Sequence, residues 1–169
     1  MLECPFCSLI GCLILNGCLY GYTEDSAVMA KKGHRILCSN RKNRKGCGRS
    51  FSILRADCIR YFRISAITLW IFLCGLMKNL PVIKAFRNTG SRMVQTTAYR
   101  IYNRFKTCQP RIRSFLSRIT GPPHMPDSID PVVQTISHLT NAFPHSPCPV
   151  SEYQCFFSSS FLSIQDSSV

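Results

Sequence analysis

The sequence is poor in acidic residues, with 8 Asp and Glu against 21 Lys and Arg. Every basic residue lies between Lys31 and Arg118, and Asp57 is the only acid in that stretch. Metal-dependent strand transfer on nucleic acid needs clustered carboxylates that hold two Mg²⁺ ions. One carboxylate cannot form such a cluster, and the acids of the C-terminal tail do not form a plausible set. The sequence therefore argues against this class of catalysis.

Other catalytic signatures are also missing. The sequence has no glycine-rich phosphate loop. His124, His138 and His145 lie among Pro, Ser and Thr, without a Ser or Cys in a recognisable nucleophile motif. We therefore expect a protein that is not an enzyme and has no small-molecule substrate.

Apolar runs long enough to cross a membrane are absent as well. The stretch of residues 4–22 is uncharged, but Asn16-Gly17 is a turn signal inside it. Ile64 to Met77 spans 14 residues, fewer than the roughly 20 that a bilayer requires. We interpret both as core segments. A small basic membrane-associated protein with residues 64–77 inserted in the bilayer is the alternative.

Eleven cysteines are present, an odd number at irregular spacing. The N-terminus has no basic region typical of a secretory signal, and secreted disulfide scaffolds are usually shorter. We expect a reducing, cytoplasmic setting.

Positive charge is concentrated in the middle of the chain. Residues 31–118 carry 21 basic residues and one acid, a net charge of +20, whereas the flanks carry seven acids and no base. Such a segment repels itself unless a polyanion neutralises it, and nucleic acid or an anionic membrane surface are the usual partners.

Hydrophobic patterning predicts an α+β protein with three parts. Residues 1–54 are expected to form a small β-rich zinc-ribbon-like unit, with a hairpin that turns at Asn16-Gly17 and further strands at residues 34–37 and 50–54. The segment of residues 23–33 is expected to be a polar loop.

Residues 55–119 are expected to form a basic, helix-turn-helix-like helical bundle. Ser65 is a candidate cap for the first helix, and Pro81 can open the second. A third helix spans residues 96–107, and Gln109-Pro110 is expected to break it before a further helix at residues 111–119.

Residues 120–169 are expected to be a Pro/Ser-rich linker and a partly ordered tail. One helix is predicted to start at Asp130-Pro131, and Ser151 to Gln154 have the form of a capping box.

Two distant cysteine pairs are candidate metal ligands. Cys4-Pro5-Phe6-Cys7 is a C-x-x-C knuckle whose thiolates can meet one tetrahedral Zn²⁺. The natural complement is Cys38 with Cys47, although eight residues separate them where two to four are usual. We interpret this gap, Ser39 to Gly46, as a basic finger inserted into the second knuckle. His34 or Cys58 are possible substitutes for one ligand. Alternatively, Cys4 and Cys7 are a redox pair or buried apolar residues. A zinc with four thiolates would be structural, because no coordination position remains open for water.

The two knuckles resemble a known family. Cys4-Pro-Phe-Cys7 followed by Cys47-Gly-Arg-Ser-Phe51 is similar to the N-terminal zinc ribbon of several insertion-sequence transposases, which a helix-turn-helix follows. The resemblance covers roughly residues 4–118. It implies DNA binding at element ends, with Cys4, Cys7, Cys38 and Cys47 as ligands. Because no catalytic domain follows, a DNA-binding remnant or an accessory protein fits better than a complete transposase.

Candidate nucleic-acid contacts fall in three segments. The third helix has polar residues suited to base edges or phosphates, and the basic residues before Cys47 and after Pro110 suit the phosphate backbone. These candidates are Arg41, Lys42, Arg44, Lys45, Thr97, Arg100, Asn103, Arg104, Lys106, Arg111 and Arg113.

The expected partner is double-stranded DNA. RNA is the alternative, because the ribbon suits it equally and Tyr61, Phe62 and Phe51 are able to stack on bases.

Overall fold

The computed structural model describes residues 2–24, 28–124 and 130–164. They divide into two compact units, a strand unit that ends at Arg55 and a helical unit that begins at Ala56. The chain contains a three-stranded antiparallel sheet and several helices, so the predicted α+β class is confirmed. In the part of the chain that is described, no helix combines the length and the apolarity needed to cross a membrane.

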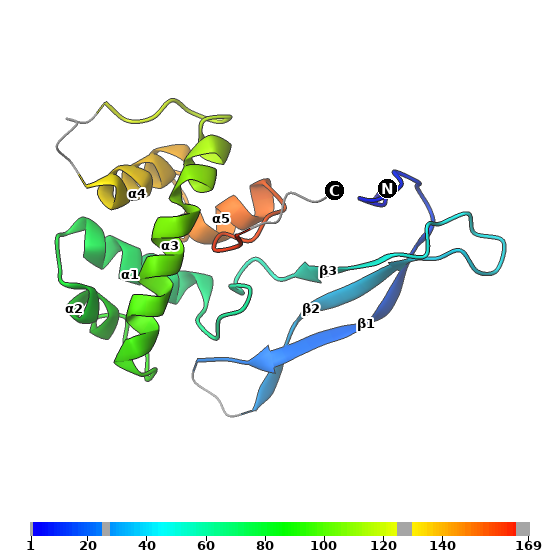
Figure 1. Cartoon of the computed structure of the whole chain (residues 1–169), viewed down its shortest axis with the longest axis horizontal. Helices are drawn as coiled ribbons and strands as arrows, with labels where there is room; N and C mark the ends of the chain where they lie inside the picture. Colours follow the sequence, from blue (N-terminus) through cyan, green and yellow to red (C-terminus); the bar gives the residue numbers. More distant parts are fainter. Residues whose placement is uncertain (1, 25–27, 125–129, 165–169) are drawn as a thin grey trace. The chain divides into compact units, whose positions relative to one another are not determined.

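The strand unit is built on strands β1 (Leu13–Tyr22), β2 (Met29–Cys38) and β3 (Ser50–Leu54). They pair in the order β1-β2-β3 (Figure 1). The bounds of β3 are those that the sequence predicts. β2 is longer than expected, because residues 29–33, predicted as part of a loop, also pair with β1.

The predicted hairpin at Asn16-Gly17 is wrong, because both residues lie inside β1. Leu15 pairs with Ile36 and Cys18 pairs with His34, so two residues of β1 face one residue of β2. This is a β-bulge, and Gly17 has the positive φ of +136° that few other residues tolerate. Because of the bulge, β1 continues past Asn16-Gly17 without turning, and its residues on both sides of the bulge pair with β2.

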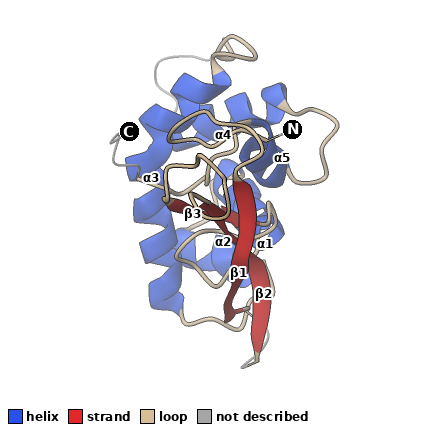
Figure 2. Ribbon diagram, turned by 90° about the vertical axis from the view of Figure 1, so that its right-hand side faces the viewer, coloured by secondary structure: helices blue, strands red, loops and turns tan. Residues whose placement is uncertain are grey.

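The helical unit contains five helices among the described residues: α1 (Ala66–Met77), α2 (Val82–Arg87), α3 (Gln95–Leu116), α4 (Pro131–Ala142) and α5 (Pro149–Phe156). Ser65 caps α1 as predicted, and its hydroxyl accepts a hydrogen bond from the Thr68 amide at 3.1 Å. α3 packs against α2 and α4, while α1 packs against α2, α4 and α5. Figure 2 shows α3 along its full length.

A single apolar core holds these helices together. Phe72 of α1, Phe105 of α3, Ile136 of α4 and Tyr153 of α5 are all fully buried in it. The segment that follows α5 also contributes, through Phe161. Residues 130–164, which the sequence analysis assigns to a tail, therefore belong to the helical unit and complete its core.

The predicted break at Gln109-Pro110 is wrong, because α3 runs through both residues. Pro110 has no N–H to donate to the preceding turn, which costs roughly 3 kcal/mol in a helix interior. The buried positions Phe105, Cys108 and Ile112 nevertheless stay in helical phase across it. Packing of this continuous apolar stripe outweighs the lost hydrogen bond.

The predicted capping box at Ser151 to Gln154 is also wrong. α5 begins earlier, at Pro149, and its N-cap Cys148 makes no side-chain cap bond. Gln154 is buried and bonds to backbone elsewhere: its amide donates to the carbonyls of Ala56 at 2.7 Å and Cys58 at 3.2 Å. Its carbonyl accepts from the Phe161 amide at 3.0 Å. Gln154 thus links the first residues of the helical unit to the segment after α5.

We predict that Gln154→Ala lowers the free energy of unfolding of the helical unit by about 1–3 kcal/mol, because it leaves backbone groups buried without partners. Urea denaturation followed by circular dichroism measures this loss. Gln95→Ala, at the exposed start of α3, is the control and should change stability by less than about 0.5 kcal/mol. Equal effects of the two substitutions would contradict the linking role of Gln154.

Candidate metal centre and basic loop

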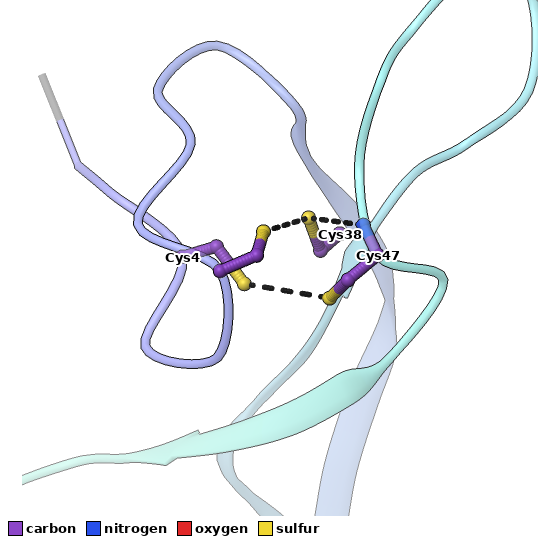
Figure 3. Close-up of side chains that lie close together, drawn as sticks. Cys4, Cys38 and Cys47 are labelled. Carbon is purple, nitrogen blue, oxygen red and sulfur yellow. Dashed lines mark hydrogen bonds between the residues drawn. The ribbon is translucent and has the colours of Figure 1, made fainter.

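Four cysteine sulfurs of the strand unit lie together. The Sγ atoms of Cys4, Cys7, Cys38 and Cys47 are all within 4.8 Å of one another. Cys4 Sγ is 3.8 Å from Cys47 Sγ, and Cys7 Sγ is 3.7 Å from Cys38 Sγ. Figure 3 shows the side chains of Cys4, Cys38 and Cys47 pointing toward one another from separate segments. The four thiols can hold a metal ion, and they are the four that the sequence predicts.

The first pair sits in a tight N-terminal knuckle. An antiparallel bridge between Glu3 and Ile10 closes it, and the Cys4 amide donates to the Leu9 carbonyl at 3.1 Å. Inside the knuckle, the Ser8 amide donates to the Cys4 carbonyl at 2.8 Å. The Phe6 amide points at Cys4 Sγ, at 3.5 Å. Such N–H···S contacts stabilise a thiolate.

The second pair forms a knuckle of the same kind despite its long spacing. Cys38 ends β2, and the amide of Gly46 donates to the carbonyl of Ser39 at 3.0 Å. This hydrogen bond closes the base of a loop, so that residues 40–45 project from it. The Cys47 amide then approaches Cys38 Sγ at 3.3 Å. With the loop set aside, the chain reads Cys38-Ser39-Gly46-Cys47, which has the spacing of a C-x-x-C motif.

Gly46 is required for this closure. A Cβ atom at this position would lie 2.3 Å from the Ser39 carbonyl oxygen and 2.7 Å from Cys38 Sγ. Both distances are far below van der Waals contact. The absence of a side chain at Gly46 therefore lets the loop base and the sulfur cluster form together.

The thiols of the cluster differ in acidity. Burial acts to raise the pKa of Cys4, but backbone hydrogen bonds from Phe6 and Cys7 outweigh it and lower this pKa to about 7. Burial raises the pKa of Cys38 to about 12, and the neighbouring thiols add to this rise. Cys4 thus gives up its proton readily, whereas ionisation of Cys38 needs a cation beside it.

The core of the strand unit around the sulfur cluster is small and rich in cysteine. Cys4, Cys12 and Cys38 are its buried residues, with Phe6 and Leu13 packed against them. Few large apolar side chains thus hold the knuckles together. His34 and Cys58, the possible substitute ligands, are not members of the sulfur cluster.

The loop between the paired ligands is strongly basic. We call residues 40–45 the basic loop. Its four cationic residues, Arg41, Lys42, Arg44 and Lys45, are all exposed. Lys42 and Asn43 have φ values of +50° and +63°, and the Arg44 amide donates to the Arg41 carbonyl at 3.2 Å. The loop is therefore a defined turn whose ends are fixed at the sulfur cluster.

The candidates on α3 divide into two groups. Arg100, Asn103 and Lys106 are exposed, and the guanidinium of Arg100 lies over the ring of Phe62, 5.1 Å from its centroid. Thr97 and Arg113 are half-buried.

The remaining candidates, Arg104 and Arg111, are used inside the helical unit. Arg104 donates from Nε to the Leu162 carbonyl at 2.8 Å. Arg111 donates to the Ser163 carbonyl and to the Ser159 hydroxyl. These two side chains hold the segment after α5, a role that sequence reasoning missed.

The segment between Cys38 and Cys47 forms a basic loop within the second knuckle, as its sequence indicates. The hydrogen bond between Ser39 and Gly46 that closes its base was not predicted.

No protein-family model, curated protein or solved structure matches this chain.

We predict that Gly46→Ala weakens metal binding by about 10- to 100-fold, the range seen when a group that orients a ligand is disturbed. Competition with a chromogenic chelator measures the affinity. Gly121→Ala is the matched control, because a Cβ there meets nothing within 4 Å. If both variants bind metal like the unchanged protein, the close approach at Gly46 is not needed for the cluster.

Proposed function

We propose that the strand unit is a zinc ribbon and that the protein is a non-catalytic nucleic-acid-binding protein whose ligand is double-stranded DNA. The observation that carries this proposal is the basic loop, four exposed cations on a turn whose two ends are the ligand pair Cys38 and Cys47. The two knuckles also keep their resemblance to the transposase ribbons, which favours a transposase-related or accessory role.

Zinc is the metal that best suits the cluster. A tetrahedral ion with Zn–S bonds of about 2.3 Å separates its sulfurs by about 3.8 Å. Two of the sulfur pairs, Cys4 with Cys47 and Cys7 with Cys38, lie at 3.8 and 3.7 Å. Disulfide bonds do not compete for these sulfurs, since all four cysteines are free. Four thiolates also complete the coordination of zinc, so the ion has a structural role.

The ion would act on DNA binding through the loop. Closing the sulfur cluster fixes both ends of the basic loop, so its cations are arranged before the ligand arrives. Binding then costs less conformational entropy than it would for a free basic segment. Arg41, Lys42, Arg44 and Lys45 would neutralise phosphates along the DNA backbone.

α3 would supply further contacts from the helical unit. Its exposed residues Arg100, Asn103 and Lys106 combine a guanidinium, an amide and an ammonium, which suit guanine, adenine and phosphate respectively. In this proposal α3 is the groove-binding helix of a helix-turn-helix-like bundle, and α1 and α2 support it without contacting the DNA. Thr97 and Arg113 are half-buried and would contribute less.

We predict about one zinc per chain in purified protein. Elemental analysis measures it. Cys4→Ser should abolish stoichiometric zinc and unfold the strand unit, because binding of a structural ion contributes much of the folding free energy of such small units. Cys18→Ser is the control, since Cys18 is exposed and lies outside the cluster. A zinc content that survives Cys4→Ser would refute the ribbon.

We also predict that replacing the four cations of the basic loop by Ala weakens binding to a 20-base-pair duplex and flattens its salt dependence. Each lost phosphate contact lowers the slope of log affinity against log salt by about 0.9, so the slope should fall by about three to four. Fluorescence anisotropy across a salt series measures both quantities.

The matched control removes the same charge from the helical unit. Lys78, Lys84, Arg87 and Arg92 are exposed and lie outside the proposed contacts. Their replacement by Ala should change the slope by less than one. A slope that falls equally in both variants would mean that net charge alone governs binding. A single-stranded RNA of equal length serves as a competitor. If it competes more strongly than duplex DNA, this result favours RNA as the ligand.

A further inference from the structure

The helical unit contains an open pocket. Some of its lining residues are proposed duplex contacts, but the pocket itself has no role in duplex binding. Its volume is about 570 Å³, within the range of sites that hold small organic molecules. All its lining residues belong to the helical unit, and they include Tyr61, Phe62, Arg100, Asn103, Arg104 and Ile164.

The aromatic wall comes from a short loop before α1. A bridge between Cys58 and Ser65 closes this loop, and Ile59 and Ile64 anchor it with only 1% of their surfaces exposed. Tyr61 is the opposite case, with 70% of its surface exposed. Its φ of +67° is rare for a residue with a side chain and is maintained by the anchored ends of the loop. The fold thus holds an aromatic ring out into solvent at the rim of the pocket.

Polar residues of α3 form another part of the lining. The guanidinium of Arg100 lies over Phe62, which fixes it beside the pocket. Arg104 is fixed in turn by its bond to the Leu162 carbonyl, and the exposed Asn103 also lines the pocket. A third guanidinium, that of Arg60, lies 4.9 Å from the centroid of the Tyr61 ring. None of the lining residues is acidic.

This combination selects a ligand with an aromatic ring and a negative charge. A base can stack on an exposed tyrosine whatever its sequence, since every base has a π face. A phosphate suits two guanidiniums that are already fixed in position. The amide of Asn103 can bond to a base edge. A nucleotide has all three features, but a paired base inside a duplex cannot reach a pocket of this kind without leaving its stack.

We propose that this pocket binds one unpaired nucleotide, with its base on Tyr61 and its phosphate at Arg100 and Arg104. The inference builds on the proposed nucleic-acid-binding function, but it uses residues of the helical unit and needs neither the zinc nor the basic loop. The nucleotide comes from a single strand or is a free mononucleotide, and both share this chemistry.

The test uses the full zinc-loaded chain with two labelled probes, single-stranded (dT)12 and a blunt 20-base-pair duplex. Tyr61→Ser should weaken binding of (dT)12 by between about fivefold and a hundredfold, the range that loss of one base–aromatic stack produces. Binding of the blunt duplex should change less than twofold. Because Tyr61 is largely exposed, the substitution does not disturb the core, and Tyr61→Phe should restore binding of (dT)12.

A second comparison tests the phosphate contact. Arg100→Gln should weaken binding of (dT)12 more than Arg87→Gln, which removes the same charge from an exposed position of α2 outside the pocket. Competition with dTMP distinguishes the two sources of the nucleotide. Displacement of (dT)12 by micromolar dTMP identifies a free nucleotide as the ligand, and failure to displace it identifies a strand.

Two results would overturn the proposal: no binding of (dT)12 to the unchanged protein, or losses in Tyr61→Ser and Arg100→Gln no larger than in Arg87→Gln. The proposed duplex function fails separately, on the duplex probe and the basic-loop variant. If the protein binds (dT)12 through Tyr61 but does not bind the duplex, the pocket proposal stands and the duplex-binding function is refuted.

Discussion

The fold of the strand unit depends on the close approach of four cysteine sulfur atoms. Two knuckles at the same end of the three-stranded sheet, where Leu13 pairs with Cys38 and Leu37 pairs with Ser50, bring their thiols within 4.8 Å, and the apolar core around them is small. The hydrogen bond between Ser39 and Gly46 is the constraint that makes this possible, because it shortens a ten-residue segment to the span of a compact knuckle. Without that closure, Cys38 and Cys47 would not act as neighbours.

The same closure sets where charge is displayed. The basic loop projects from the closed base beside the cluster, and four of its six residues are cationic and exposed. In the helical unit the positive charge is arranged differently. Arg104 and Arg111 serve as internal donors, whereas Arg100 is held against an aromatic ring at the edge of a pocket. Counting basic residues therefore overstates the charge that each surface offers to a ligand.

Local signals in the sequence predicted the elements that depend on local physics. The cap at Ser65, the strand at Ser50–Leu54 and the helix start at Asp130-Pro131 follow from capping and alternation alone. The four cysteines of the cluster were also predicted, from one C-x-x-C pair and a second pair at longer spacing, with His34 and Cys58 left as possible substitutes.

Predictions failed where tertiary pairing overrides a local signal. Asn16-Gly17 became a bulge because one long partner strand pairs with the residues on both sides of it. Pro110 stayed inside α3 because buried residues continue in phase beyond it. Gln154 resembled part of a cap, yet its side chain bonds to residues almost a hundred positions away. The pocket beside Tyr61 could not be predicted, since it joins three segments that are distant in the sequence.

The arginine contacts of α3 have a consequence for the C-terminal part of the chain. Arg104 donates a hydrogen bond to the Leu162 carbonyl, and Arg111 donates to the Ser163 carbonyl and the Ser159 hydroxyl. Ile164, from the same segment, lines the pocket. A protease cut shortly before Ser159 would release both guanidiniums and would also detach Phe161 and Leu162 from the core. The segment that neutralises the donors of α3 is thus also one that the helical unit needs for its stability.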